Sequence, residues 1–191
     1  RVGRESTVGR GTRYSLAGNA EARSIVVGAD GNLWFAFNDR RIGRMLPDGT
    51  VTTFTHPEVD GLVDLVAGPD GNVWFTFGGA DSSVSAGDGG IGRISPAGVI
   101  TVVDGGYDIE PGEIALGPDG NLWFAGAGIA RVTPAGVVTW FEVAGDDPGA
   151  LTRLLAVGSD GRLWHDLGSP GQPSTHVGAM STTGVDALVE L

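Results

Sequence analysis

The chain has 191 residues, of which 23 are Asp or Glu and 12 are basic, and its net charge is −11. Because every basic residue is Arg and the arginines form no cluster, we expect neither nucleic acid nor a membrane surface as a partner. The sequence has no Cys, which excludes disulfides and thiolate metal sites, and no apolar run approaches the roughly 20 residues of a membrane helix.

The N-terminal segment reads as two short strands. Residues 2–16 align with residues 42–55, which form the second half of a unit that recurs along the chain. We therefore interpret residues 1–18 as the last two strands of a repeat whose first two strands are absent from the sequence.

The first complete unit spans about residues 19–57. Its apolar runs at 25–27 and 33–35 flank Asp30-Gly31. Asp-Gly between two such runs is a strong hairpin signal, because Gly supplies the positive φ that a tight turn needs. Two further runs, joined by a second Gly turn at 47–49, complete the unit. The pattern predicts four short antiparallel strands joined by hairpins.

The phrase that contains Asp-Gly and Trp then returns three times, with its Trp residues 40, 49 and 41 positions apart. Four-stranded units at this period are typical of β-propeller blades. The predicted fold class is therefore all-β, a partial β-propeller of four-stranded antiparallel blades with four blades and half a blade present. The complete blades cover about residues 19–57, 58–104, 105–147 and 148–191, in a single repeat domain 1–191.

An open arc of blades leaves two apolar blade faces uncovered. Three explanations remain open. The chain is a fragment of a longer propeller, which we favour, or it assembles with another chain, or it closes as a small ring in which the first two strands complete an outer edge. The composition is that of a soluble all-β protein.

The repeated Trp residues are predicted to pack between blades, because a bulky residue at one place in every blade buries much apolar area. Trp140 lies outside the pattern and is a candidate contact residue on an exposed edge. The arginines of the repeated Ile-Gly-Arg phrase are predicted to pair with neighbouring blades or with the Asp-Gly turns. These two sets are Trp34, Trp74, Trp123 and Trp164, and Arg44, Arg93 and Arg131.

Other polar features have a structural interpretation. His56, His165 and His176 have no mutual spacing that indicates a metal cluster, so each is predicted to be an isolated surface or packed side chain. The insertion at 78–90 contains Asp residues but lacks the alternating carboxylates of a calcium loop, and is predicted to be a plain loop.

The phrase Gly-Pro-Asp-Gly-Asn-(Leu/Val)-Trp-Phe, followed by Ile-Gly-Arg and a Gly-Val-(Ile/Val)-Thr strand, resembles the repeats of the streptogramin B lyase (virginiamycin B lyase) propellers. The likeness covers nearly the whole chain and implies a seven-bladed ring, with roughly two to three blades beyond those present here. It is clearest at Gly68–Phe75, Ile91–Thr101, Gly117–Phe124 and Arg131–Thr139.

The resemblance also implies a kind of chemistry. In this family a Glu-Pro-His-Gly stretch leads into an inner strand, where the His is a general acid or base and the Glu helps to hold Mg²⁺. A second His lies at the same place in another blade, and a further Glu follows the Trp-Phe-x strand as a metal ligand. Such a site removes a proton next to a carbonyl and expels the ester oxygen, so that a cyclic depsipeptide opens while the metal stabilises the enolate.

This chain departs from the family pattern at the His position and at the later Glu position of every visible blade. The His position is eleven residues before each repeated Trp, and it holds Arg23, Val63, Gly112 and Arg153. The stretch 110–113, Glu-Pro-Gly-Glu, resembles the motif with its His lost. The position of the later Glu ligand holds Phe37, Phe77, Gly126 and Leu167.

Two functions follow from these residues. We favour a ligand-binding or scaffold propeller that holds a small polar molecule or a peptide, with no catalytic residue, metal ligand or cofactor in the visible blades. The alternative is a Mg²⁺-dependent carbon–oxygen lyase of the virginiamycin B lyase type, which opens a cyclic depsipeptide antibiotic and is seen here as a fragment. We expect further blades or a second chain to cover the open blade faces. A ligand site is expected at the mouth of the central channel, where the first strands begin, and its candidate residues are Glu21, Arg23, Glu110, Glu113 and Arg153.

Overall fold

The computed structural model describes residues 2–5, 11–14, 21–78, 89–103, 111–126, 128–143, 152–153, 155–168 and 176–189, the first two ranges as backbone alone. Every regular element in these ranges is a β-strand, so the all-β prediction is confirmed. The strands are β1 (Val2–Glu5), β2 (Gly11–Tyr14), β3 (Ala22–Val27), β4 (Leu33–Phe37), β5 (Ile42–Met45), β6 (Val51–Phe54), β7 (Leu62–Ala67), β8 (Val73–Phe77), β9 (Gly90–Ile94), β10 (Ile100–Val103), β11 (Ile114–Leu116), β12 (Leu122–Gly126), β13 (Gly128–Val132), β14 (Val138–Phe141), β15 (Leu155–Val157), β16 (Leu163–Leu167), β17 (His176–Met180) and β18 (Asp186–Val189).

Four sheets of the described chain are four-stranded and antiparallel, with their strands in chain order. We number them sheet 1 (β3–β6), sheet 2 (β7–β10), sheet 3 (β11–β14) and sheet 4 (β15–β18). Strands β1 and β2 pair antiparallel as a separate two-stranded sheet. No helix among the described residues has the length and apolar character needed to cross a lipid bilayer.

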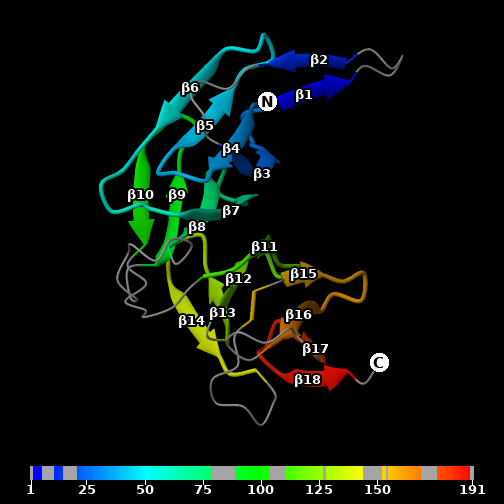
Figure 1. The fold of residues 1–191 in the computed structure, drawn as a ribbon. Coiled ribbons are helices and arrows are strands. Elements are labelled where there is room, and N and C mark those ends of the chain that lie inside the picture. The colour runs from blue at the N-terminus through cyan, green and yellow to red at the C-terminus, as the bar shows by residue number, and fades with distance from the viewer. Residues whose placement is uncertain are drawn as a thin grey trace.

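The sheets follow one another along a curved array, as Figure 1 shows. Neighbouring sheets meet through their first strands: β3 contacts β7, β7 contacts β11, and β11 contacts β15. The first strand of each sheet is therefore the innermost, and the fourth strand lies at the outer edge (Figure 1). This is the arrangement of blades in a β-propeller.

The turns between the first and second strands have the glycine geometry that the sequence predicts. Gly31 has φ of 75°, and no other residue type in the described chain has a positive φ. The Gly28 N–H donates to the Asn32 carbonyl oxygen at 2.9 Å, and the Gly31 N–H donates to the Gly28 carbonyl oxygen at 2.9 Å. A positive-φ residue that ends a short hairpin loop is the place where Gly costs least.

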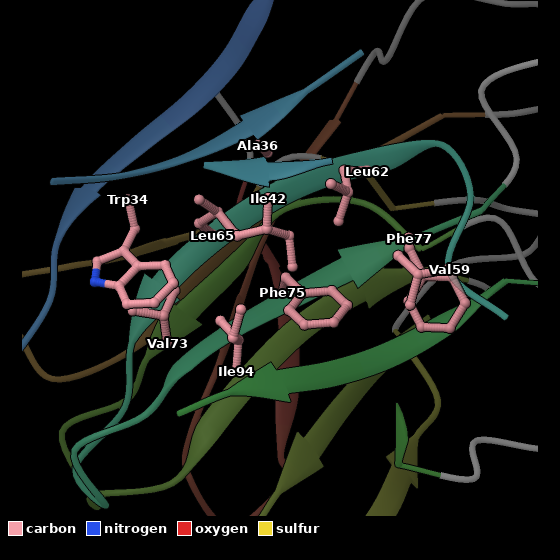
Figure 2. Packing of buried hydrophobic residues seen from close by; sticks show 10 residues of the cluster. All are labelled: Trp34, Ala36, Ile42, Val59, Leu62, Leu65, Val73, Phe75, Phe77 and Ile94. Atoms are coloured by element: carbon pink, nitrogen blue, oxygen red, sulfur yellow. The ribbon is translucent and has the colours of Figure 1, made fainter. Parts of the chain in front are cut away.

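The core lies between the sheets. In Figure 2, Trp34 and Ile42 of sheet 1 and Phe75 and Ile94 of sheet 2 belong to one buried cluster. Trp74 and Trp123 occupy the same place in the next two clusters, so each indole points toward the following sheet. The three side chains are almost completely buried, which confirms the prediction that they pack between blades.

Trp164 differs from the other repeated Trp residues. Its side chain is only half-buried, and among the described residues no further sheet follows sheet 4 to cover it. The prediction of an inter-blade core position for Trp164 is therefore wrong for this structure.

Trp140 also departs from the expectation of an exposed edge: its ring packs edge-on against Phe124, with 5.3 Å between centroids, beside the cluster of Trp74.

Candidate functional site

The turn aspartates hold the buried indoles in place. Oδ1 of Asp119 accepts a hydrogen bond from the Trp123 indole N–H at 3.0 Å, and its Oδ2 accepts one from the Asn121 side-chain amide at 2.9 Å. Partial burial raises the pKa of Asp119, but these hydrogen bonds outweigh it and leave the pKa below its ordinary value. The same hydrogen bond joins Asp30 to Trp34 and Asp70 to Trp74. These carboxylates are structural groups.

The repeated arginines lie over the indoles and connect neighbouring sheets. The guanidinium of Arg93 stands 5.4 Å from the Trp74 ring centroid, and its Nη1 donates to the Pro134 carbonyl oxygen of the next sheet at 2.9 Å. It also lies 3.4 Å from the Asp70 carboxylate. Arg44 donates likewise to a carbonyl of sheet 2, that of Pro96. The prediction that these two arginines pair with a neighbouring blade is confirmed.

Polar side chains on the inner strands form a ladder from sheet to sheet. The Ser24 hydroxyl donates to Asp64 Oδ1 at 2.6 Å and accepts from the Leu65 N–H at 3.2 Å. Oδ2 of Asp64 accepts in turn from the Ile114 N–H, 3.1 Å away. Ser24, Asp64 and Glu113 each lie ten residues before a repeated Trp. We call this set of contacts the inner ladder.

Glu113 continues the inner ladder into sheet 4. Its Oε2 accepts a hydrogen bond from the Leu155 N–H at 3.0 Å, and its own N–H donates to the Arg153 carbonyl oxygen at 2.9 Å. The beginnings of the four inner strands therefore form a continuous row along the inner edge of the array. Glu113 and Arg153, two of the candidate ligand residues, are neighbours there.

The positions immediately before Ser24 and Asp64 lie at an irregularity of the inner strand. The register of β3 against β4 shifts between Ala22 and Ser24, and the register of β7 against β8 shifts between Leu62 and Asp64. An extra residue in one strand re-aims its side chain out of the regular alternation. The bulged position is the one to which the resemblance assigns the family's His.

The four bulged or equivalent residues are not alike. The side chains of Arg23 and Arg153 are exposed, and that of Val63 is half-buried. Gly112 is buried, and a Cβ atom added to it would lie 2.5 Å from the Arg153 carbonyl oxygen and 2.8 Å from the Arg153 Cα. Backbone atoms at such distances leave no room for a side chain.

The remaining candidates fall in different places. Glu21 is exposed at the start of sheet 1, where its N–H donates to Asn38 Oδ1 at 3.1 Å. Glu110 lies outside the described residues, as does most of the insertion at 78–90. The structure brings Glu113 and Arg153 together, whereas β7 separates them from Glu21 and Arg23. Sequence reasoning missed Asp64, although its spacing from Trp74 matches that of Glu113 from Trp123.

The residues that the structure describes do not fit the magnesium site that the family resemblance implies. The position of the Glu ligand after the Trp-Phe-x strand is occupied by buried groups: Phe37, Phe77, Gly126 and Leu167. Within the described ranges, no three side chains of His, Asp or Glu come together in an arrangement that suits a metal ion.

His165 is a core residue. Its side chain is buried, its Nε2 lies 3.0 Å from Asp186 Oδ1, and its Nδ1 lies 3.2 Å from the Asp166 carbonyl oxygen. His56 is half-buried and accepts the Glu58 N–H at 3.3 Å, and His176 is exposed. Of the two alternatives predicted for His165, a surface or a packed side chain, the structure shows the packed one.

Comparisons with known proteins identify the fold. No protein-family model and no curated protein sequence matches the chain. Among solved structures, the chain resembles virginiamycin B lyase from Staphylococcus aureus in a catalytically inactive form with quinupristin, with a TM-score of 0.81 and 26% identity over 99% of this chain and 62% of that one. The selenomethionine-substituted form of the same lyase matches equally over 99% of the chain, with a TM-score of 0.80.

More distant structures share the fold alone. The extracellular domain of a hybrid two-component system from B. thetaiotaomicron has a TM-score of 0.68 at 12% identity, over 94% of this chain and 23% of that chain. A structure described as a putative gluconolactonase has a TM-score of 0.59 at 19% identity, over 86% and 61% of the two chains. The chain has a streptogramin-lyase-like propeller fold, and it spans 62% of the length of the lyase that it resembles.

Proposed function

We propose that this chain is a ligand-binding propeller whose inner-strand rim holds a small polar molecule or a peptide, and that it performs no acid–base chemistry at this rim. The proposal rests on the position and the surroundings of Gly112. It stands at the family's His position inside the best-preserved copy of the motif, and the Arg153 backbone occupies the space that a side chain would need.

The inner ladder supports the same proposal. A general base must be free to take a proton from the substrate. The carboxylates of Asp64 and Glu113 instead accept backbone N–H groups of the next sheet. The rim arginines Arg23 and Arg153 carry a permanent positive charge and do not act as bases at neutral pH. Exposed guanidinium groups bind carboxylates well, so the ligand we propose carries an acidic group.

A titration with small charged peptides tests this proposal. With Asp-Ala-Arg as the probe, we expect backbone amide resonances at 21–24, 111–113 and 152–153 to shift together in an NMR titration. Arg23→Ala and Arg153→Ala should each weaken binding, while Arg162→Ala, on the turn of sheet 4 beyond its inner strand, should not. Shifts confined to the Asp-Gly turns would contradict the proposed rim site.

The second candidate function is a lyase that opens a cyclic depsipeptide. It is favoured by the likeness over 99% of this chain to a lyase whose structure was determined with quinupristin. Incubation of the protein with quinupristin and Mg²⁺ separates the two functions. An elimination gives a linear isomer of unchanged mass, so the product is detected by chromatographic retention and fragmentation. We expect intact quinupristin, and a ring-opened product would establish the lyase.

A further inference from the structure

The Asp-Gly pairs of this chain are of two structural kinds. An Asp-Gly pair rearranges to an isoaspartyl linkage more readily than other dipeptides, because Gly has no side chain to hinder its own nitrogen. The described ranges contain six such pairs. One of them, Asp60-Gly61, lies in the segment that joins β6 to β7. The other five are hairpin turns, at Asp30, Asp48, Asp70, Asp119 and Asp160.

In the five hairpin turns the Gly nitrogen and the carboxylate before it have separate partners. Each Gly N–H donates to the backbone carbonyl oxygen three residues earlier, at 2.9–3.3 Å. Each Asp Oδ1 accepts the backbone N–H two residues later, at 2.9–3.2 Å. A reaction between the two groups requires the turn to open first.

At Asp60-Gly61 the same two groups contact each other. The Gly61 N–H donates to Oδ1 of Asp60 itself, at 2.9 Å. Oδ2 of the same carboxylate accepts from Arg40 Nη2 at 2.7 Å, which holds the carboxylate in this orientation. The Asp60 side chain is 33% exposed, so water reaches it. A nucleophile held against the group that it attacks needs little further motion to react.

We propose that Asp60-Gly61 is a modification site, at which isoaspartate forms spontaneously in the folded protein while the five hairpin pairs are protected. The Gly61 nitrogen bonds to Cγ of protonated Asp60, and the amide proton and the carboxyl hydroxyl leave as water. Water then cleaves the bond between this nitrogen and the Asp60 main-chain carbonyl carbon. The main chain now passes through Cγ, the former carbonyl carbon carries a free carboxylate, and the mass of the protein is unchanged.

The modification alters the entry to sheet 2. It lengthens the main chain by a methylene group just before β7, the strand that carries the ladder residue Asp64. The Asp60 carbonyl oxygen accepts the Gly78 N–H at 2.8 Å, and this contact is lost when the carbonyl becomes a free carboxylate. The ion pair with Arg40 loses its present geometry for the same reason. The rearrangement should therefore loosen the inner ladder at Asp64.

Ageing of the folded and the unfolded protein tests the assignment. One sample is kept at neutral pH in buffer and the other in guanidinium chloride, and isoaspartate is located in proteolytic peptides by electron-transfer fragmentation. The unfolded sample shows the rate that each local sequence allows. We expect folding to slow the five hairpin pairs by about tenfold or more. Asp60-Gly61 should keep the rate that it has when unfolded, or exceed it. Equal slowing of all six pairs would overturn the proposal.

Asp60→Glu is the matched variant, because it keeps a carboxylate near Arg40 and its longer side chain forms a cyclic imide much less readily. We expect the variant to show no rearrangement at this position and the wild-type pattern at the hairpin turns. The aged wild type should exchange the Ile114 amide hydrogen faster than the fresh protein, because Asp64 accepts this N–H. The aged variant should not. Unchanged exchange in wild type that contains isoaspartate at Asp60 would overturn the inferred effect on the ladder.

Discussion

The carboxylate of Asp64 accepts the backbone N–H of Ile114 from the next sheet, across 3.1 Å, and its other oxygen accepts the hydroxyl of Ser24 from the preceding sheet. One side chain thus joins three sheets at the inner edge of the array. The sheets also meet through apolar clusters and through the hydrogen bonds of Arg44 and Arg93. The inner ladder adds directional contacts between the inner strands.

Removal of this side chain should weaken the joint. For Asp64→Ala we expect a loss of about 1–3 kcal/mol in the free energy of unfolding, because the Ile114 N–H keeps its buried position and loses its acceptor. Chemical denaturation measures the loss, and hydrogen exchange at Ile114 locates it. Glu58→Ala removes an equal charge from an exposed side chain and serves as the control. Equal losses in the two variants would show that the ladder contributes little.

The periodic features of the fold are predictable from the sequence because they depend on local chemistry. Asp30-Gly31 indicates a hairpin through the φ of Gly31, and the Trp period indicates a blade. The contacts between sheets are less predictable. Asp64 joins residues 40 and 50 positions away, and nothing in its local sequence shows that its oxygens accept backbone amides. Trp164 illustrates the same limit, since its burial depends on a neighbouring sheet and not on its own repeat.

The candidate site was predictable in position but not in role. The spacing from the repeated Trp correctly places Glu113 and Arg153 at the beginnings of inner strands. It does not show that Glu113 accepts the Leu155 N–H, because this contact requires two sheets to be placed side by side. Whether the rim binds a ligand stays a prediction.

Gly112 offers a direct test of the lost His position. We expect Gly112→His to lower the free energy of unfolding by about 1–3 kcal/mol, because its Cβ would collide with the Arg153 backbone. Val63→His introduces the same residue at the equivalent, half-buried bulge of sheet 2 and should be tolerated better. Thermal denaturation of the two variants compares them. A Gly112→His protein as stable as the wild type would show that the backbone at Arg153 moves aside easily.

The turn aspartates should make part of the protein's folding stability sensitive to acid. Partial burial raises the pKa of Asp119, but the hydrogen bonds from Asn121 and Trp123 outweigh this effect, so the folded pKa lies below the ordinary value of 3.8. A depressed pKa stabilises the folded state above the unfolded value, and this contribution disappears as the pH falls through the folded value. Asp119→Asn should therefore be less stable than the wild type at pH 7, with a difference that shrinks below about pH 4. Urea denaturation from pH 7 to pH 3 measures this difference, and a constant difference would contradict the assignment.

Sheet 4 contains an exchange of roles that a double-mutant cycle can test. In sheets 1 to 3 an Arg of the third strand pairs in register with the Trp, as Arg131 does with Trp123. In sheet 4, Ala179 pairs with Trp164, and the guanidinium of Arg162 from the turn lies 5.2 Å from the indole centroid. Arg162 stands where the other turns have Asn. In sheet 4 an Arg from the turn therefore takes the place over the indole that a third-strand Arg occupies in sheets 1 to 3.

If the indole needs one guanidinium from either source, Arg162→Asn alone should destabilise sheet 4 by about 0.5–1 kcal/mol, the usual magnitude of an exposed cation–π contact. Ala179→Arg alone should change stability little, because Arg162 already covers the ring. The double variant restores the arrangement of the other three sheets and should regain most of the loss. Chemical denaturation of the four proteins, followed by tryptophan fluorescence, gives the coupling energy. Strictly additive effects would mean that the two arginines do not act on the same indole.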